Sequence, residues 1–219
     1  QLFAQVTNPP LDGIREEIIT DTSLSLGSDY NIFDLIPDHA KKLKINNPII
    51  SNADLEKIKY IDHEDFKACS ISANYEISKG HNGLEKALDM IVDKVEKKVD
   101  NNHNIIILSD RKTSKKYAPI PILLVCSYVH HSLIKRKKRS KFGIVIESAE
   151  PREPHHFSML FGYGASAINP YMVNEIIEYH HKLGFLNEQK LDKSIDNFNK
   201  AIAKGILKVI NKIGISTLH

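Results

Sequence analysis

Cysteine is scarce in this sequence, and its scarcity excludes one class of protein. Only Cys69 and Cys126 occur among the 219 residues, and both lie in apolar stretches, where a free thiol packs as a small hydrophobic side chain. A chain of this length buries a full core and needs no disulfide framework. We therefore expect a protein of the reducing cytoplasm rather than a disulfide-stabilised secreted one.

Long hydrophobic runs and an excess of one charge are missing as well. No apolar run approaches the roughly 20 residues of a membrane-spanning helix, which excludes insertion into a membrane. The first residues lack the basic and then apolar pattern of a signal sequence. With 30 basic and 27 acidic residues the net charge is +3, which points to no particular partner.

The sequence patterns of metal and phosphate sites are absent too. Histidines occur in three adjacent pairs: His130-His131, His155-His156 and His180-His181. Neighbouring residues on a helix point about 100° apart, so such a pair does not converge on one ion. The segment Gly162-Tyr163-Gly164-Ala165 follows a predicted helix and precedes a strand, the reverse of the order in a phosphate-binding loop. We therefore predict no metal site and no cofactor site in this chain, and a helix end with a tight turn at these glycines.

What the sequence does contain is a repeated strand–helix pattern. An alternating pattern predicts a strand over residues 68–73, and short apolar runs predict strands over residues 105–108, 142–146 and 165–168. Apolar residues at helical spacing predict helices over residues 84–99, 121–134, 155–161 and 171–183. Strands that alternate with helices in this way form parallel sheets. We predict an α/β fold of about four parallel βα units, arranged as an open sheet or a partial barrel.

The segments on either side of these units differ from them. Residues 1–67, punctuated by Asp, Pro and Asn, predict an irregular N-terminal arm packed on the α/β body of residues 68–184. Residues 185–219 carry apolar side chains at helical spacing from Leu191 to Ile210, which predicts a connecting helix that leads out of the body. With no partner domain to cover it, the apolar face of this helix should pack back on the body or drive self-association.

Candidate ligand-binding residues follow the predicted strands, because sites in parallel α/β folds gather at the carboxyl ends of strands. These residues are Asn74, Ser109-Asp110-Arg111, Glu147-Ser148 and Asn169-Pro170, with Asp110, Arg111, Glu147 and Asn169 as the main candidates. One interpretation places Asp110 and Glu147 opposite each other, with Arg111 or Arg152 as a cation for an anionic ligand. The same residue types also form salt bridges that hold two loops together, and we favour that interpretation.

The densest charge feature is the basic run Lys135-Arg136-Lys137-Lys138-Arg139-Ser140-Lys141. Such a cluster can bind nucleic acid, and the binding would then depend steeply on salt. The run also closes a predicted helix, where cations stabilise the negative end of the helix dipole. No aromatic residues are interleaved with it, so we expect no nucleic-acid partner.

Several segments resemble the central domain of the large subunit of bacterial glutamate synthases. The most specific is Phe3-Ala4-Gln5-Val6-Thr7-Asn8-Pro9-Pro10-Leu11-Asp12, followed by Ile14-Arg15-Glu16. The similarity continues in order through Leu108-Ser109-Asp110-Arg111, Ala118-Pro119-Ile120-Pro121, Val145-Ile146-Glu147-Ser148, His155-His156-Phe157, Gly162-Tyr163-Gly164-Ala165, Asn169-Pro170-Tyr171 and residues 204–217. Gly13, Pro154 and Ile210-Asn211-Lys212-Ile213 depart from the family pattern and affect local detail only.

The resemblance implies a noncatalytic α/β domain within a larger enzyme. Such a domain joins an upstream glutamine amidotransferase domain to a downstream FMN-binding domain and helps to line an internal ammonia tunnel. The parent enzyme converts glutamine, 2-oxoglutarate and reductant into two molecules of glutamate. Its FMN and iron–sulfur cluster lie outside this chain, and a small reductase subunit is a further partner.

The resemblance also draws attention to the N-terminal arm. Its candidates for the tunnel or the domain interfaces are Thr7, Asn8, Asp12, Arg15 and Glu16. This segment holds more polar residues and prolines than a surface loop needs, although a rigid turn uses the same residue types.

Both ends of the sequence look cut, since the chain opens without a methionine and stops soon after a Lys-x-Gly-x-Ser-like segment. We therefore expect a fragment of an enzyme that is inactive in isolation. The alternative is a freestanding βα-repeat enzyme that acts on a small anion through Asp110, Arg111 and Glu147.

Overall fold

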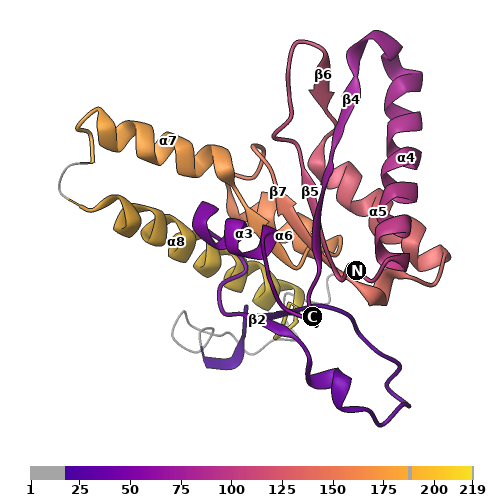
Figure 1. Cartoon of the computed structure of the whole chain (residues 1–219). Helices are drawn as coiled ribbons and strands as arrows, with labels where there is room; N and C mark the ends of the chain where they lie inside the picture. The colour runs from indigo at the N-terminus through magenta and orange to yellow at the C-terminus, as the bar shows by residue number, and fades with distance from the viewer. Residues whose placement is uncertain (1–17, 187–188, 219) are drawn as a thin grey trace.

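The computed structural model describes residues 18–186 and 189–218 and has a four-stranded parallel sheet at its centre (Figure 1). Its strands are β3 (Ala68–Ser72), β5 (Ile105–Ser109), β7 (Gly143–Glu147) and β8 (Ala167–Asn169), and they lie side by side in that order. The helices that follow them are α4 (Gly80–Asp100), α5 (Ile122–Lys135), α6 (Pro154–Gly162) and α7 (Tyr171–Lys182). The predicted α/β fold of four parallel βα units is therefore confirmed.

Helices α4, α5 and α6 cover one face of the sheet. A strictly sequential strand order with crossovers of one hand leaves the connecting helices on the same side. Alternate residues of each strand point to that side, and Ile106, Leu108 and Ile146 pack there with α4 residues such as Val92 and Val95. This face holds the larger of the two apolar cores.

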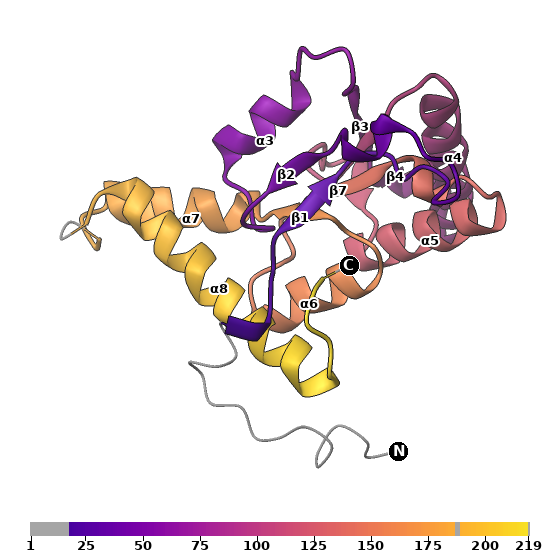
Figure 2. The ribbon, with the colours of Figure 1, turned by 90° about the horizontal axis from the view of Figure 1, so that it is seen from below.

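The opposite face is covered by elements from the segment predicted as an arm. Here β1 (Leu24–Leu26) and β2 (Leu43–Ile45) form an antiparallel pair, and η1 (Pro37–Ala40) and α3 (Asn52–Lys59) flank β2 in sequence. Figure 2 shows β1, β2 and α3 on one side of the sheet and α5 and α6 on the other. The second, smaller core joins these elements to the remaining strand residues, among them Ile105, Ile107 and Val145. The sequence interpretation did not identify these elements.

A second antiparallel pair extends the carboxyl end of the sheet. It consists of β4 (Asn74–Glu76) and β6 (Tyr117–Pro119). Two short 3-10 helices, η2 (Ile77–Lys79) and η3 (Arg139–Lys141), precede α4 and β7. Helix α4 begins four residues earlier than the sequence predicts, at Gly80, where φ is +59°. None of the helices in residues 18–186 and 189–218 is long and apolar enough to cross a membrane.

The last helix, α8 (Leu191–Ile213), packs on the body through its apolar face. Ile202, Ile206 and Ile210 are buried in the larger core, and the helix lies against α6 and α7 (Figure 1). Packing back on the body is thus the outcome that the structure shows for this face. Beyond α8, the Asp21 amide donates to the Ser216 carbonyl at 2.9 Å, and a parallel bridge joins Asp21 to Thr217.

Candidate functional site

The last residues of the four parallel strands form a row across the carboxyl edge of the sheet. Ser72 pairs in register with Ser109, Ser109 with Glu147, and Glu147 with Asn169. Residues in register share a face of the sheet, and this face is the one that α3 covers. Side chains of α3 can therefore contact the row from that face of the sheet.

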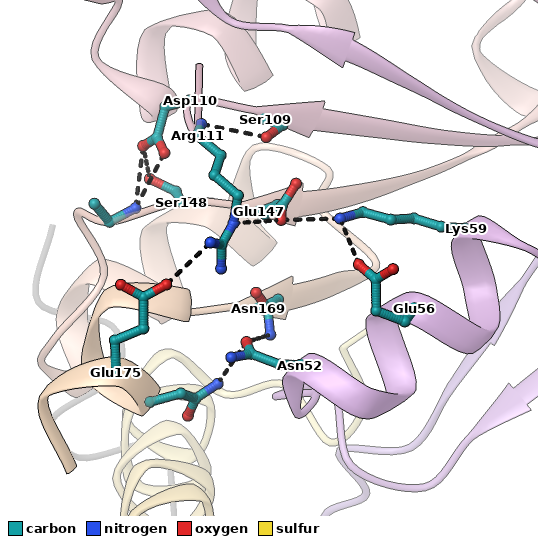
Figure 3. Close-up of polar contacts among 12 residues, drawn as sticks. Asn52, Glu56, Lys59, Ser109, Asp110, Arg111, Glu147, Ser148, Asn169 and Glu175 are labelled. Atoms are coloured by element: carbon teal, nitrogen blue, oxygen red, sulfur yellow. Dashed lines mark hydrogen bonds and ion pairs between the residues drawn. The ribbon is translucent and has the colours of Figure 1, made fainter. Parts of the chain in front are cut away.

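Glu147 is the central charge of this row. Its side chain is only 3% exposed, and Oε1 accepts a hydrogen bond from Lys59 Nζ and another from Arg111 Nε, both at 3.0 Å (Figure 3). A buried carboxylate is costly unless charged donors compensate it. Here two cations converge on one oxygen, so Glu147 is held as the shared acceptor of a salt bridge.

The two cations are paired further with exposed acids. Lys59 Nζ also lies 2.8 Å from Glu56 Oε1, and Arg111 Nη1 lies 3.0 Å from Glu175 Oε1. The Arg111 guanidinium stacks 4.1 Å from the centroid of the Tyr171 ring. We call these five residues the strand-end network: Glu56, Lys59, Arg111, Glu147 and Glu175. Three carboxylates share two cations in it, so its formal charge is negative. Such a balance does not favour an anionic ligand.

Asp110 points to the other face of the sheet. Its Oδ2 accepts from Ser148 Oγ at 2.5 Å and from the Ala149 amide at 3.1 Å (Figure 3). The two carboxylates therefore do not form the facing pair of the active-site interpretation, because Asp110 is one residue beyond the row and successive side chains alternate between faces. Burial, together with a hydrogen bond to Asp110, raises the pKa of Tyr171. Asp110 acts as a buried acceptor that fixes the loop after β7.

Asn169 joins the sheet edge to the start of α3. Its Nδ2 donates at 3.0 Å to both the Ile50 carbonyl and Asn52 Oδ1, and Asn174 Nδ2 donates to the same Asn52 oxygen at 3.1 Å. The Oδ1 atoms of Asn169 and Asn174 are buried and have no hydrogen-bond partner within the described part of the chain. The row therefore ends in a cluster of side-chain amides, two of whose oxygen atoms accept no hydrogen bond from the described residues.

Among the residues of this edge that sequence reasoning missed are Lys59 and Asn52. Both belong to α3, whose N-cap Ser51 accepts from the Asp54 amide at 3.1 Å. The sequence Ser51-Asn52-Ala53-Asp54 carries the signature of a capped helix start, so a signal for α3 was present. Nothing in the sequence indicates that α3 lies over β7.

The basic run closes α5 as expected, and half of its six cations contact other groups of the fold. Arg136 pairs with Asp93 at 2.9 Å, and Lys138 lies 2.8 Å from both Glu96 and Asp100. Arg139 turns inward and donates to the carbonyls of Phe142 and Gly164 and to His130 Nδ1. The lysines at positions 135, 137 and 141 remain exposed, which leaves little of a continuous basic surface.

The His130-His131 pair and the glycine segment take part in packing and in a turn. Rings of His130 and His131 meet edge to face at 5.1 Å, and no group of three potential metal ligands occurs among residues 18–186 and 189–218. Helix α6 ends at Gly162, and Gly164 has φ +96°, which confirms the predicted helix end and turn. The arm candidates Thr7, Asn8, Asp12, Arg15 and Glu16 lie outside the described residues.

Comparisons with known proteins agree over the whole chain. The family described as "Glutamate synthase central domain" matches residues 1–219. The chain is 37% identical over 219 residues to "Glutamate synthase [NADPH] large chain" of Bacillus subtilis, covering 100% of this chain and 14% of that protein. It is 37% identical over 225 residues to "Glutamate synthase [NADH]" of Schizosaccharomyces pombe, covering 100% and 10%, and 33% identical over 231 residues to "Ferredoxin-dependent glutamate synthase 2" of Synechocystis, covering 100% and 15%.

Proposed function

The chain belongs to the glutamate synthase central domain family, and on that premise we propose that it joins the glutamine amidotransferase and FMN-binding domains of a glutamate synthase. The observation that carries this proposal is the match itself, which spans all of this chain but only 10–15% of the relatives' length. The parent reaction then forms two molecules of glutamate from glutamine, 2-oxoglutarate and reductant. The relatives' names include NADPH, NADH and ferredoxin, so they do not select the electron donor.

The meeting of two distant segments supports a linking role. Asp21 and Thr217 lie side by side, and a parallel bridge makes the two segments run in the same direction there. The chain before Asp21 and the chain after Thr217 therefore leave this point in opposite directions. The connections toward the two sides of the chain therefore meet in one region of the body, as a linking role requires.

The chemistry of the strand ends supports a noncatalytic role. Glu147 is buried between two cations, and Asp110 and Ser148 are 1% and 0% exposed. A nucleophile or general base must reach the reacting atoms of a substrate. The Ser148 hydroxyl donates to Asp110, and its oxygen accepts from the Glu150 amide at 3.1 Å, so its hydrogen-bonding capacity serves the loop.

The cofactors of the parent enzyme belong to other parts of the polypeptide in this proposal. An iron–sulfur cluster requires about four thiolate ligands. This chain has two cysteines, and burial raises the pKa of Cys69 to about 11 and that of Cys126 to about 12. These residues do not fit a cluster, and we assign no residue of this chain to FMN.

The role of the N-terminal arm in the ammonia passage is part of the proposal. Transfer of ammonia between distant sites needs exclusion of water and fixed spacing rather than new reactive groups. Replacing Asn8 by alanine in the complete enzyme should increase the glutamine hydrolysed per glutamate formed. A variant that keeps the wild-type ratio would remove Asn8 from the passage.

The test of the central proposal is the size of the natural polypeptide. We expect an antibody raised against this chain to detect a polypeptide several times heavier than 24.8 kDa in a fresh lysate. A stable polypeptide near that mass would contradict the linking role. It would favour a freestanding enzyme, which the isolated chain could reveal by turnover of a small anionic substrate.

A further inference from the structure

The loop between β1 and β2 exposes large apolar side chains to an unusual degree. Ile32 is 80% exposed, Phe33 is 85% exposed and Leu35 is 99% exposed, while Tyr30 and Ile36 are partly exposed. Single exposed apolar residues are common on protein surfaces, but a contiguous group marks an interaction site. We call residues 30–36 the apolar loop.

The apolar loop is held in shape by its own polar atoms. The Phe33 amide donates to Asn31 Oδ1 at 3.2 Å, and the Asp34 amide donates to the Asn31 carbonyl at 2.9 Å. The Asp34 carbonyl lies 2.8 Å from His39 Nε2 and accepts from the Ile36 amide at 2.9 Å. These bonds order the backbone while the apolar side chains stay in solvent. A preordered segment loses less conformational entropy when it docks.

The base of the loop is anchored at the amino edge of the sheet. Ser28 Oγ donates to the Lys141 carbonyl at 2.6 Å, and the Asp29 amide donates to the Ser140 carbonyl at 2.6 Å. Both acceptors lie just before β7, at the end of the strand opposite to Glu147. The apolar loop and the strand-end network therefore occupy opposite ends of the sheet. The loop also begins soon after Asp21, where the chain runs beside Thr217.

We propose that the apolar loop inserts into an apolar cavity with a basic rim in another domain of the same polypeptide. This inference rests on the proposed function, because the relatives devote 85–90% of their length to sequence outside this region. The exposed Asp34 lies between Phe33 and Leu35, which calls for basic residues around the receiving cavity. A second copy of this chain fits less well, because a two-fold contact between loops would bring two Asp34 carboxylates together.

The test is hydroxyl-radical footprinting of the complete polypeptide, with Phe33 compared with Tyr60. Tyr60 is a matched internal control, because it is aromatic, 78% exposed and located at the end of α3. After correction for intrinsic reactivity, we expect Phe33 to be modified at least about tenfold more slowly than Tyr60. Replacing Leu35 by glutamate should restore modification of Phe33, whereas Met90→Glu on the exposed face of α4 should not.

Equal modification of Phe33 and Tyr60 in a polypeptide several times heavier than 24.8 kDa would overturn the inference and leave the linking role intact. Protection of Phe33 that disappears on dilution would identify a second copy as the partner and would also overturn it. A natural polypeptide near 24.8 kDa would remove both proposals, because it leaves no other domain to receive the loop.

Discussion

Replacing Glu147 by glutamine removes the central negative charge of the strand-end network while it keeps side-chain volume and one acceptor oxygen. The carboxylate is 3% exposed and accepts from Lys59 and Arg111. Removing one partner of a fully buried ion pair costs about 3–5 kcal/mol. Each cation here keeps a second carboxylate, Glu56 or Glu175, and Arg111 is 43% exposed, so we expect a smaller loss of about 2 kcal/mol.

Urea unfolding followed by circular dichroism measures this loss, and the same change should lower the melting temperature by about 4–8 °C. The matched control is Glu175→Gln, because Glu175 is 44% exposed and pairs with the same arginine. Its expected cost is about 0.5 kcal/mol. A Glu147→Gln variant as stable as the wild type, or more stable, would refute the structural role. A gain in stability is typical of residues kept for function at the expense of stability, so it would favour the active-site alternative.

Three further predictions concern the core and the turn after α6. Gly164→Ala should lower the free energy of unfolding by about 3 kcal/mol, because φ is +96° and the new Cβ would lie 2.1 Å from His130 Nδ1. Gly162→Ala should cost less than about 0.5 kcal/mol, because apart from its chain neighbours and its own helix backbone no atom lies within 4 Å of the new Cβ. Similar unfolding midpoints for the two variants would contradict the clash. Burial, and after it the charge of Arg139, lowers the pKa of His130 from 6.5 to about 4. Between these pH values the unfolded chain binds more protons than the folded chain, so the free energy of unfolding falls as the pH drops from 6.5 to 4. Wild type should lose more stability over that interval than His130→Gln, and parallel unfolding curves would exclude this contribution. Native thiol labelling at mildly alkaline pH should be slow at both cysteines and slower at Cys126 than at Cys69, because burial raises both pKa values; rapid labelling of Cys126 in the folded chain would contradict its burial.

The sequence predicts the parallel sheet most clearly at its two central strands, β5 and β7, because each lies in a continuous apolar run. Ile105, Ile106, Ile107 and Leu108 are all buried, with odd and even positions in the two separate cores. A strand covered on both faces leaves this run as its signature. By contrast, β1 and β2 are three residues long and lie in a segment rich in turn residues, so their pattern is too short to separate from a loop.

The sequence predicts the strand-end members of the candidate site, but not the residues of α3 and α7 that contact them. Asp110, Arg111, Glu147 and Asn169 all lie at the carboxyl edge, since the carboxyl ends of parallel strands meet there. The pairing of Glu147 with Lys59 spans 88 positions and depends on the placement of α3 over β7. No local pattern encodes such a contact.

The sequence by itself determined the family, the alternation of strands and helices and the edge of the sheet at which polar residues gather, because motifs and periodicity are properties of neighbouring residues. The tertiary structure decided which face each polar side chain occupies, which cations neutralise Glu147, and that α8 packs on the body. It also decided that the apolar loop stays in solvent, although its composition alone would suggest burial. These outcomes depend on contacts between segments far apart in the chain, where only packing in three dimensions sets the free energy.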